Sequence, residues 1–249
     1  MIQHSEVQSL LRDGITLSSL TPGGVAAVFG ASGGIGGALV EAIRATGRFG
    51  HVIGFGRGTS PPADLLDEAS LERAAAFAAD KGTLRLVIDA TGFLHDAGQV
   101  PEKSWQQLDP QHLARSFALN AIGPALIMKH VLPRLPRSGR SVFATLSARV
   151  GSIGDNRLGG WYGYRASKAA LNQLARTASV ELARRSPEAL CIALHPGTVE
   201  TPLSAPFAAT GLEVHSPATA AGHLLAVIDR LPPDANGGFF DWRGETVPW

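Results

Sequence analysis

Two side chains that together could carry acid–base chemistry lie four residues apart in the second half of the chain. Tyr164 and Lys168 occur in the segment YGYRASK, residues 162–168. On a helix, residues at this spacing share one face. A nearby ammonium group favours the ionised form of a phenol and lowers its pKa from about 10 toward the range where proton transfer is efficient. We therefore predict that Tyr164 donates or accepts a proton. The alternative is a solvated helix end with an aromatic residue.

A glycine-rich turn near the start of the chain predicts a nucleotide site. The segment GASGGIG, residues 30–36, lies between an apolar run and a helical pattern. Glycine permits a tight turn and lets backbone amides approach a pyrophosphate, and the following helix begins with unpaired N–H groups and a partial positive charge. The predicted contacts are Gly30, Ser32, Gly34, Ile35 and Gly36. The alternative is a tight turn with a structural role only.

Arg57 distinguishes between the two nicotinamide nucleotides. It follows the second apolar run, in the segment GFGRG at residues 54–58, which contains no carboxylate. In dinucleotide-binding folds an acidic residue here binds the free ribose 2′-hydroxyl, whereas an arginine accommodates a 2′-phosphate. The fork of guanidinium donors suits phosphate. The sequence favours NADP(H) over NAD(H), with an ordinary surface arginine as the alternative.

The elements that must position these residues alternate along the chain. Apolar runs predict strands at Val25–Phe29, His51–Phe55, Leu84–Ala90, Ser141–Leu146 and Leu190–Leu194, with a last short strand near Gly238–Asp241. Periodic segments predict helices at Ile35–Ala45, Ser70–Ala79, Gln111–Leu132, Tyr164–Arg184 and Pro217–Arg230. This alternation indicates an α/β fold. We predict a single Rossmann domain over residues 1–249, with a doubly wound, mostly parallel sheet and helices on both faces.

Composition restricts the class of protein. The chain is 45% hydrophobic with a formal net charge of +1, so it can bury a core and has no charge excess for nucleic acid or a membrane surface. One cysteine, Cys191, excludes an internal disulfide and fits a reducing compartment. We find neither a signal-peptide pattern nor an apolar run near the roughly 20 residues that span a bilayer. We expect a cytoplasmic protein. His95 and His195 lack metal-ligand spacing, so we expect no metal site and interpret both as structural.

These motifs, in this order, resemble the short-chain dehydrogenase/reductase family from Gly24 to the C-terminus. The matched positions are Gly30, Gly34 and Gly36 of the glycine turn, Asn120 of a helix, Ser147 at a strand end, the Tyr164–Lys168 pair and the Pro196-Gly197 turn. Several matching motifs are more specific than any one of them. The resemblance implies a Rossmann-fold oxidoreductase that binds a nicotinamide nucleotide.

The resemblance also assigns roles to these residues. Tyr164 would pass its proton to a carbonyl oxygen as hydride arrives from the nicotinamide, and Ser147 would hydrogen-bond the same oxygen. Lys168 would hold the nicotinamide ribose and keep the phenol acidic, and Asn120 would hold a water of the proton relay. Ser147 as an ordinary strand-end serine, and Asn120 as a helix residue that bonds its own backbone, are the alternatives.

Further cofactor contacts follow from the same resemblance. They are Asp64 and Leu65 at the adenine, the turn Ala90, Thr91 and Gly92, and Pro196, Gly197, Val199 and Thr201, with Thr201 at the nicotinamide amide. In the family the adenine-contacting pair follows a short third strand, which the pattern of this sequence does not show.

Three stretches depart from the family pattern. Asp89-Ala90-Thr91-Gly92 replaces Asn-Asn-Ala-Gly, which predicts the loss of a side chain that steadies the sheet. The segment 151–161 lengthens the interval between Ser147 and Tyr164, and we predict that it forms a flap beside the substrate. With the closing WRGETVPW, it is similar to the C-factor-like branch, which includes carbonyl reductases. Residues 1–23 form an N-terminal extension, interpreted as a docking helix or a frayed terminus.

The region before the last predicted helix is expected to contact the substrate. Residues 203–216 are expected to cover the substrate, with Pro206, Phe207, Leu212 and Val214 as an apolar wall. The leading hypothesis is NADPH-dependent reduction of an aldehyde or ketone. An NAD-dependent alcohol dehydrogenase, and an NADP(H)-binding signalling or redox-sensing protein that acts through a partner, are the alternatives.

Pairing through the helices at Gln111–Leu132 and Tyr164–Arg184, as the family implies, predicts a homodimer or homotetramer.

Overall fold

The burial of the first strand shows how the sheet is built. A computed structural model describes residues 14–204 and 213–249. In β1 (Val25–Phe29) every residue is buried. Ala26 and Val28 pack into one apolar cluster, whereas Val25, Ala27 and Phe29 pack into another. Successive side chains of a strand point to opposite faces, so β1 is covered on both sides.

Six parallel strands form the main sheet in the order β2-β1-β3-β4-β5-β8. Besides β1 they are β2 (His51–Phe55), β3 (Leu84–Asp89), β4 (Ser141–Leu146), β5 (Ala189–His195) and β8 (Phe239–Asp241). The predicted fold class is confirmed, including the last strand, which pairs with β5. A small second sheet, β6 (Thr198–Val199) with β7 (Val214–His215), lies where no strand is predicted.

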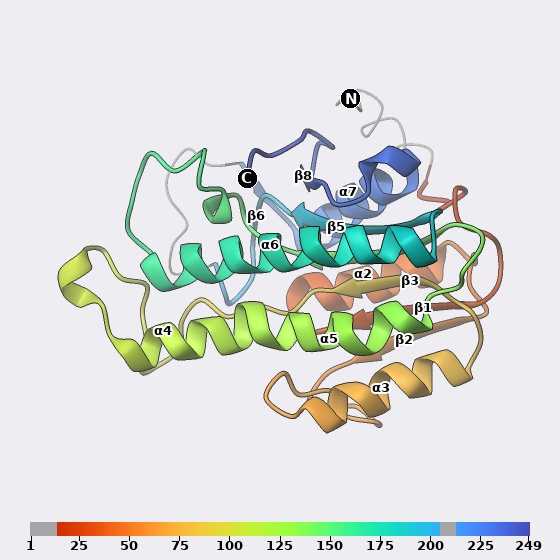
Figure 1. Cartoon of the computed structure of the whole chain (residues 1–249), viewed down its shortest axis with the longest axis horizontal. Helices are drawn as coiled ribbons and strands as arrows, with labels where there is room; N and C mark the ends of the chain where they lie inside the picture. The colour runs from red at the N-terminus through yellow and green to blue at the C-terminus, as the bar shows by residue number, and fades with distance from the viewer. Residues whose placement is uncertain (1–13, 205–212) are drawn as a thin grey trace.

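Helices cover both faces of the sheet (Figure 1). In that view α3 (Glu68–Asp80), α5 (Gly123–Val131) and α6 (Tyr162–Arg185) lie in front, and α2 (Gly34–Ala45) and α7 (Pro217–Arg230) lie behind. The two apolar clusters contain residues of these two groups of helices. Short 3-10 turns occur at Trp105–Gln107, Leu132–Arg134, Arg149–Gly151 and Pro233–Ala235.

The helix predicted over Gln111–Leu132 is confirmed as a continuous helical stretch, but it contains an irregular turn. The structure has α4 (Pro110–Phe117), a π-helical turn at Ala118–Ile122 and then α5. The sequence contains the cause, since Pro124 has no N–H to donate to the carbonyl of Asn120, four residues earlier. The ladder of α-helical hydrogen bonds is therefore interrupted at Asn120.

The short third strand implied by the family is also wrong. The described residues 56–67, between β2 and α3, form turns and no strand. Pro61 and Pro62 lie in this stretch, and proline lacks the N–H that a strand ladder requires. As a result β2 lies at the end of the strand order.

The described part of the N-terminal extension is docked on the sheet. Residues 14–23 contain turns and no helix. Leu17 and Leu20 are fully buried in the cluster that includes α2 and α7. The Asp229 carboxylate accepts the N–H groups of Ser18 and Ser19 at 2.9 and 2.7 Å. Residues 1–13 lie outside the described part of the chain.

Within the described ranges, no helix combines the length and apolar character needed to cross a membrane. The assignment of residues 1–249 to one domain stays a prediction.

Candidate functional site

The glycine turn lies where the strand order reverses. β1 is flanked by β2 on one side and β3 on the other, and open α/β sheets bind ligands at such a point. Gly30 has φ +82, and a Cβ added there would lie 2.9 Å from the carbonyl carbon of Ala90. A Cβ on Gly36 would overlap the carbonyl oxygen of Gly30. The tight turn into α2 therefore requires glycine at both positions.

The start of α2 offers backbone donors to this turn. The described residues supply no side-chain cap at its N-cap residue, Gly33, and the first N–H groups of a helix have no partner within the helix. Ser32, Gly34 and Ile35 line a cavity at this end. Because the peptide dipoles add a partial positive charge, the position suits a phosphate group.

One cavity of about 470 Å³ collects most of the predicted site residues. Those that line it are Ser32, Gly34, Ile35, Gly36, Ala90, Thr91, Gly92, Ser147, Tyr164, Lys168, Pro196 and Thr201. They follow the carboxyl ends of β1, β3, β4 and β5 or belong to α2 and α6. The fold thus places the glycine turn and the Tyr–Lys pair around one space.

Six predicted nucleotide contacts lie outside this lining, namely Arg57, Asp64, Leu65, Asn120, Gly197 and Val199. Arg57 is exposed and follows Gly56, where an added Cβ would lie 3.2 Å from the Ser32 hydroxyl oxygen. Arg57 is therefore next to the glycine turn. Asp64 accepts the N–H of Leu66 at 3.0 Å, and Leu65 packs closely over Gly123 at the start of α5.

The turn after β5 is closed by an aromatic side chain. Gly197 has φ +79, and a Cβ there would lie 2.9 Å from the Trp242 ring. Val199 is buried in β6. Thr201 reaches the glycine turn, because a Cβ on Gly34 would lie 3.0 Å from its methyl group. Gly197 and Val199 support this turn from outside the lining, while Thr201 faces the cavity.

Helix α6 places Tyr164 and Lys168 one turn apart, as predicted. The Lys168 ammonium donates to the Leu146 carbonyl at 2.8 Å and lies 6.0 Å from the centroid of the Tyr164 ring. Burial raises the pKa of Tyr164 to about 12. Burial also lowers the pKa of Lys168 to about 8, an effect that the Asp89 carboxylate opposes. The predicted lowering of the Tyr164 pKa is therefore wrong here, since Lys168 is directed at a backbone carbonyl while the phenol is desolvated.

Ser147 follows the last residue of β4 and faces the cavity. Its N–H donates to the Leu194 carbonyl at 2.8 Å, which fixes the backbone against β5. Its buried hydroxyl oxygen has no hydrogen-bond partner among the described residues. A buried polar group without a partner is costly, so this hydroxyl is suited to bind an oxygen atom of a substrate.

Asn120 lies in the π-helical turn and joins three segments. Its side-chain oxygen accepts the N–H of Phe93 at 2.8 Å, and its side-chain nitrogen donates to the Phe93 carbonyl at 2.8 Å and to the Ser167 hydroxyl at 3.2 Å. The alternative that it bonds its own backbone is wrong, since Phe93 is 27 residues away. Its role in a water relay stays a prediction.

Asp89 steadies the sheet where the family has asparagine. The Thr145 hydroxyl on β4 donates to Asp89 at 2.7 Å, and Thr91 donates its hydroxyl at 2.6 Å and its N–H at 3.0 Å. Burial raises the pKa of this carboxyl, although these hydrogen bonds oppose the change. The predicted loss of a steadying side chain is wrong, because a threonine on the adjacent strand supplies the donor. Asp89 and Thr145 are register partners.

Four further side chains that the sequence did not indicate as site residues line the cavity, namely Phe93, His95, Leu146 and Pro202. Leu203, the first residue of the expected substrate cover, lines it too. His95 has a ring nitrogen 3.2 Å from the Pro202 carbonyl, so the loops after β3 and β6 meet there. Phe93, Leu146 and Pro202 are each next to a matched residue, which is the available signal, whereas His95 lies three residues after Gly92. Of the expected substrate cover, Pro206, Phe207 and Leu212 lie outside the described residues.

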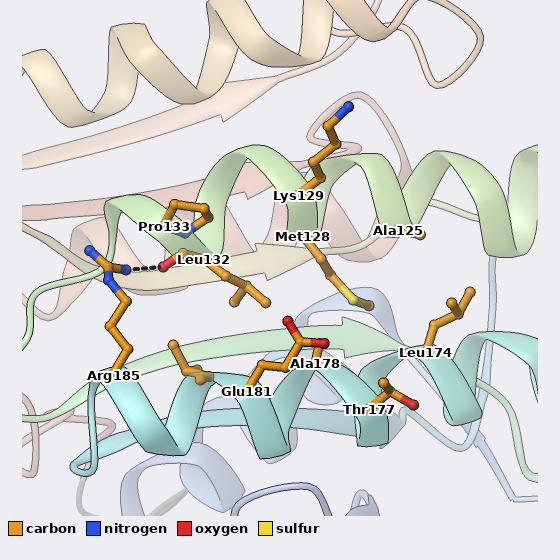
Figure 2. A pocket seen from close by; sticks show the side chains of 11 residues that line it. Ala125, Met128, Lys129, Leu132, Pro133, Leu174, Thr177, Ala178, Glu181 and Arg185 are labelled. Carbon is orange, nitrogen blue, oxygen red and sulfur yellow. Dashed lines mark hydrogen bonds between the residues drawn. The ribbon is translucent and has the colours of Figure 1, made fainter.

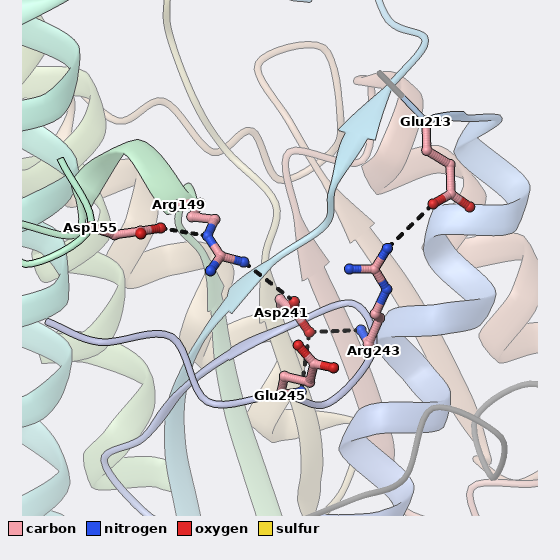
Figure 3. A network of polar contacts seen from close by, with 6 residues as sticks. All are labelled: Arg149, Asp155, Glu213, Asp241, Arg243 and Glu245. Carbon is pink, nitrogen blue, oxygen red and sulfur yellow. Dashed lines mark hydrogen bonds and ion pairs between the residues drawn. The ribbon is translucent and has the colours of Figure 1, made fainter. Parts of the chain in front are cut away.

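The segment 151–161 is fastened to the C-terminal residues (Figure 3). Arg149 donates to Asp155 at 2.6 Å and faces the Asp241 carboxylate of β8 at 3.8 Å. The N–H of Gly154 donates to the Trp249 carbonyl at 2.8 Å. Arg243 pairs with Glu213, just before β7, at 3.4 Å. The role predicted for segment 151–161, a flap beside the substrate, stays a prediction.

The fold and the cavity together define a dinucleotide-fold oxidoreductase with a Tyr–Lys pair. The model of the short chain dehydrogenase family matches residues 24–211. The chain belongs to this family, the short-chain dehydrogenases/reductases.

Curated relatives support the assignment. The chain is 33% identical over 189 residues to 1-hydroxy-2-glutathionyl-2-methyl-3-butene dehydrogenase of Rhodococcus sp. (strain AD45), covering 76% of this chain and 79% of that protein. It is 39% identical over 142 residues to C-signal of Myxococcus xanthus, covering 57% of this chain and 81% of that protein.

Solved structures share the fold. NADPH-bound carbonyl reductase from chicken fatty liver superposes with a TM-score of 0.80 at 24% identity, covering 92% of this chain and 95% of that one. Carbonyl reductase Sniffer of D. melanogaster superposes with a TM-score of 0.76 at 22% identity, covering 90% and 99%.

Proposed function

We propose that the protein is an NADP(H)-dependent reductase of an aldehyde or ketone, with Tyr164 as its general acid. One observation carries the proposal: Ser147, Tyr164 and Lys168 line the same cavity as the glycine turn. A phenol, a hydroxyl without a protein partner and an ammonium group at one carbonyl oxygen are sufficient for acid-assisted reduction.

Ser147, Tyr164 and Lys168 have separate roles in the proposed reaction. When bound, NADPH supplies the hydride. The Ser147 hydroxyl donates a hydrogen bond to the substrate carbonyl oxygen and stabilises the charge that develops there. Tyr164 gives its proton to the same oxygen. The ammonium group of Lys168, held by the Leu146 carbonyl, favours the phenolate that remains.

The glycine turn and Arg57 support the choice of cofactor. The uncapped start of α2 and two glycines that exclude a Cβ fit a pyrophosphate. Arg57 is exposed and follows Gly56, which lies against Ser32, so its guanidinium group is a candidate to bind a 2′-phosphate. The solved carbonyl reductase from chicken fatty liver is NADPH-bound, which agrees with this choice.

Binding of NADPH and NADH to the wild type and to Arg57→Ala tests the proposal. We expect NADPH to bind the wild type at least about tenfold more tightly, roughly 1.4 kcal/mol, and the variant to lose that preference. Equal binding of both nucleotides overturns the role of Arg57 and favours an NAD-dependent alcohol dehydrogenase. Binding of neither overturns the proposed enzyme.

The relative named C-signal favours a second candidate function, an NADP(H)-binding signalling protein. The two are separated by Tyr164→Phe in cells. Loss of the biological effect with the phenol supports catalysis, whereas full effect without it supports signalling through a partner.

We also infer a homodimer or homotetramer. An apolar groove of about 510 Å³ lies between α5 and α6, lined among others by Met128, Leu174 and Ala178 (Figure 2). Leu174 is 38% exposed there. A second copy is the occupant that the family implies, and a monomeric mass by solution scattering would refute it. The cytoplasmic location stays a prediction.

A further inference from the structure

Helix α6 begins without a capping side chain of its own. Its N-cap residue, Trp161, has a left-handed backbone conformation with φ +52 and makes no side-chain cap hydrogen bond. Helix starts usually carry Ser, Thr, Asp or Asn at this position. Tyr164 lies in the first turn of α6, so the position of the phenol depends on how this end is held.

Glu102 supplies the missing acceptors from a segment 61 residues earlier. One of its carboxylate oxygens accepts the N–H of Gly163 at 3.1 Å, and its backbone carbonyl accepts the N–H of Trp161 at 2.5 Å. The residue is 4% exposed. A carboxylate at a helix start also interacts favourably with the helix dipole.

The packing around Gly163 fits this contact. A Cβ on Gly163 would lie 3.0 Å from the other carboxylate oxygen of Glu102 and 3.2 Å from the Ser116 hydroxyl oxygen. Gln99 donates to that hydroxyl at 3.1 Å, which holds it in place. The glycine therefore lets the carboxylate approach the helix. The second carboxylate oxygen is buried and has no hydrogen-bond partner among the described residues.

The two backbone groups that Glu102 holds belong to the residues around Tyr164. The rings of Trp161 and Tyr164 pack edge to face, with their centroids 6.2 Å apart. Movement of Trp161 or Gly163 would displace the Tyr164 ring relative to Ser147 and Lys168. A misplacement of about 1 Å at a reacting group can reduce the rate about a hundredfold.

We propose that Glu102 is a positioning residue for Tyr164, acting as a remote cap of α6. The inference rests on the proposed function for its effect on rate, but the capping contact is independent of activity. The proposed role of Glu102 depends on the carboxylate oxygen that accepts the N–H of Gly163.

Three substitutions of Glu102 and one matched control test the proposal. Glu102→Ala removes the side-chain acceptor, Glu102→Asp withdraws it by one methylene, and Glu102→Gln keeps an oxygen in place. The control is Glu188→Ala, because Glu188 likewise accepts a remote backbone N–H, that of Gly139 at 2.7 Å, and does not line the cavity. Kinetic constants with NADPH and an aldehyde, and amide hydrogen exchange over residues 161–166, are measured for each.

We expect Glu102→Ala and Glu102→Asp to lower kcat at least about tenfold and to speed exchange over 161–166 at least about tenfold. The affinity for NADPH should stay within about twofold. Glu102→Gln should restore both quantities to within about threefold of the wild type, and Glu188→Ala should leave them unchanged. If Glu102→Ala does not fold, Glu102→Asp and Glu102→Gln carry the comparison.

Unchanged exchange in the Ala and Asp variants overturns the cap, whatever the activity. Faster exchange with an unchanged kcat overturns the effect on Tyr164. A wild type that binds NADPH but reduces no aldehyde or ketone refutes the proposed function, and the exchange data then still decide the capping contact.

Discussion

The starts of α2 and α6 present the same unpaired backbone donors and treat them in opposite ways. At α2 the described residues provide no side-chain cap, and the end opens on the cavity. At α6 a buried glutamate from another segment accepts one of the donors. Donors left open can bind an anion, whereas donors that are satisfied fix a helix in place. One helix end is therefore suited to bind an anionic nucleotide, and the other is suited to hold the acid–base residue.

The largest effect should come from removing the phenol that α6 positions. We expect Tyr164→Phe to lower kcat about a thousandfold, because general acid catalysis contributes about 10² to 10⁴ in rate. NADPH affinity should stay near that of the wild type, since the start of α2 is untouched. Steady-state kinetics and a nucleotide titration provide the check, and a large loss of NADPH affinity would contradict the division of roles.

A substitution at the start of α2 should mainly affect NADPH binding. Gly36→Ala places a methyl group against the Gly30 carbonyl, and we expect it to lower the free energy of unfolding by about 2–3 kcal/mol and to abolish NADPH binding. The matched control is Gly37→Ala, where the nearest atom is 3.3 Å away. Thermal unfolding and NADPH titration of both variants should separate them. Equal effects would show that the turn tolerates a side chain.

Deprotonation of the Lys168 ammonium group on α6 should lower kcat at alkaline pH. The lowered pKa of Lys168, about 8, means that the ammonium loses its proton as the pH rises through that value. We expect kcat to fall above about pH 8 in the wild type, because the phenolate then loses its cationic neighbour. Lys168→Arg keeps its charge, so any remaining activity should show no such fall. If kcat of Lys168→Arg falls above about pH 8 as in the wild type, the fall is not caused by deprotonation of Lys168.

The smallest effect should come from a helix start with an ordinary local cap. The Ser216 hydroxyl accepts the N–H of Thr219 at 3.0 Å at the start of α7. We expect Ser216→Ala to lower the free energy of unfolding by about 1 kcal/mol, measured by urea denaturation, without changing kcat. A loss of activity similar to that expected for Glu102→Ala would remove the distinction between α6 and an ordinary capped helix.

Sequence patterns predicted the parts of the site that follow from local spacing. The strand and helix alternation, the glycine turn and the four-residue spacing of Tyr164 and Lys168 depend on neighbours in the chain, and the structure brings them to one cavity. Ser147 was identified through the resemblance to the family, which has a serine at the end of a strand before the Tyr–Lys helix.

Features that depend on distant partners were not predictable. The tie between Asp89 and Thr145 requires the register of β3 against β4. The contact of Glu102 with Gly163 links segments with no shared pattern. The pKa of Tyr164 was predicted in the wrong direction, because it depends on burial and on where Lys168 points rather than on spacing. The irregular turn at Asn120 and the absence of a strand after β2 have local causes in the sequence, Pro124 and the Pro61-Pro62 pair.

The π-helical turn at Ala118–Ile122 has a consequence for how length changes would act on this protein. A π turn holds one residue more than an α turn, and each residue of a helix rotates the following ones by about 100°. The turn therefore takes up one extra residue, so that α4 and α5 keep their orientation toward the sheet. Deleting one residue within it would leave an ordinary α turn and keep Met128 and Val131 buried, whereas deleting one residue at the start of α5 would rotate both away from the sheet. Changes of length are thus better tolerated inside this turn than in the regular helix that follows it.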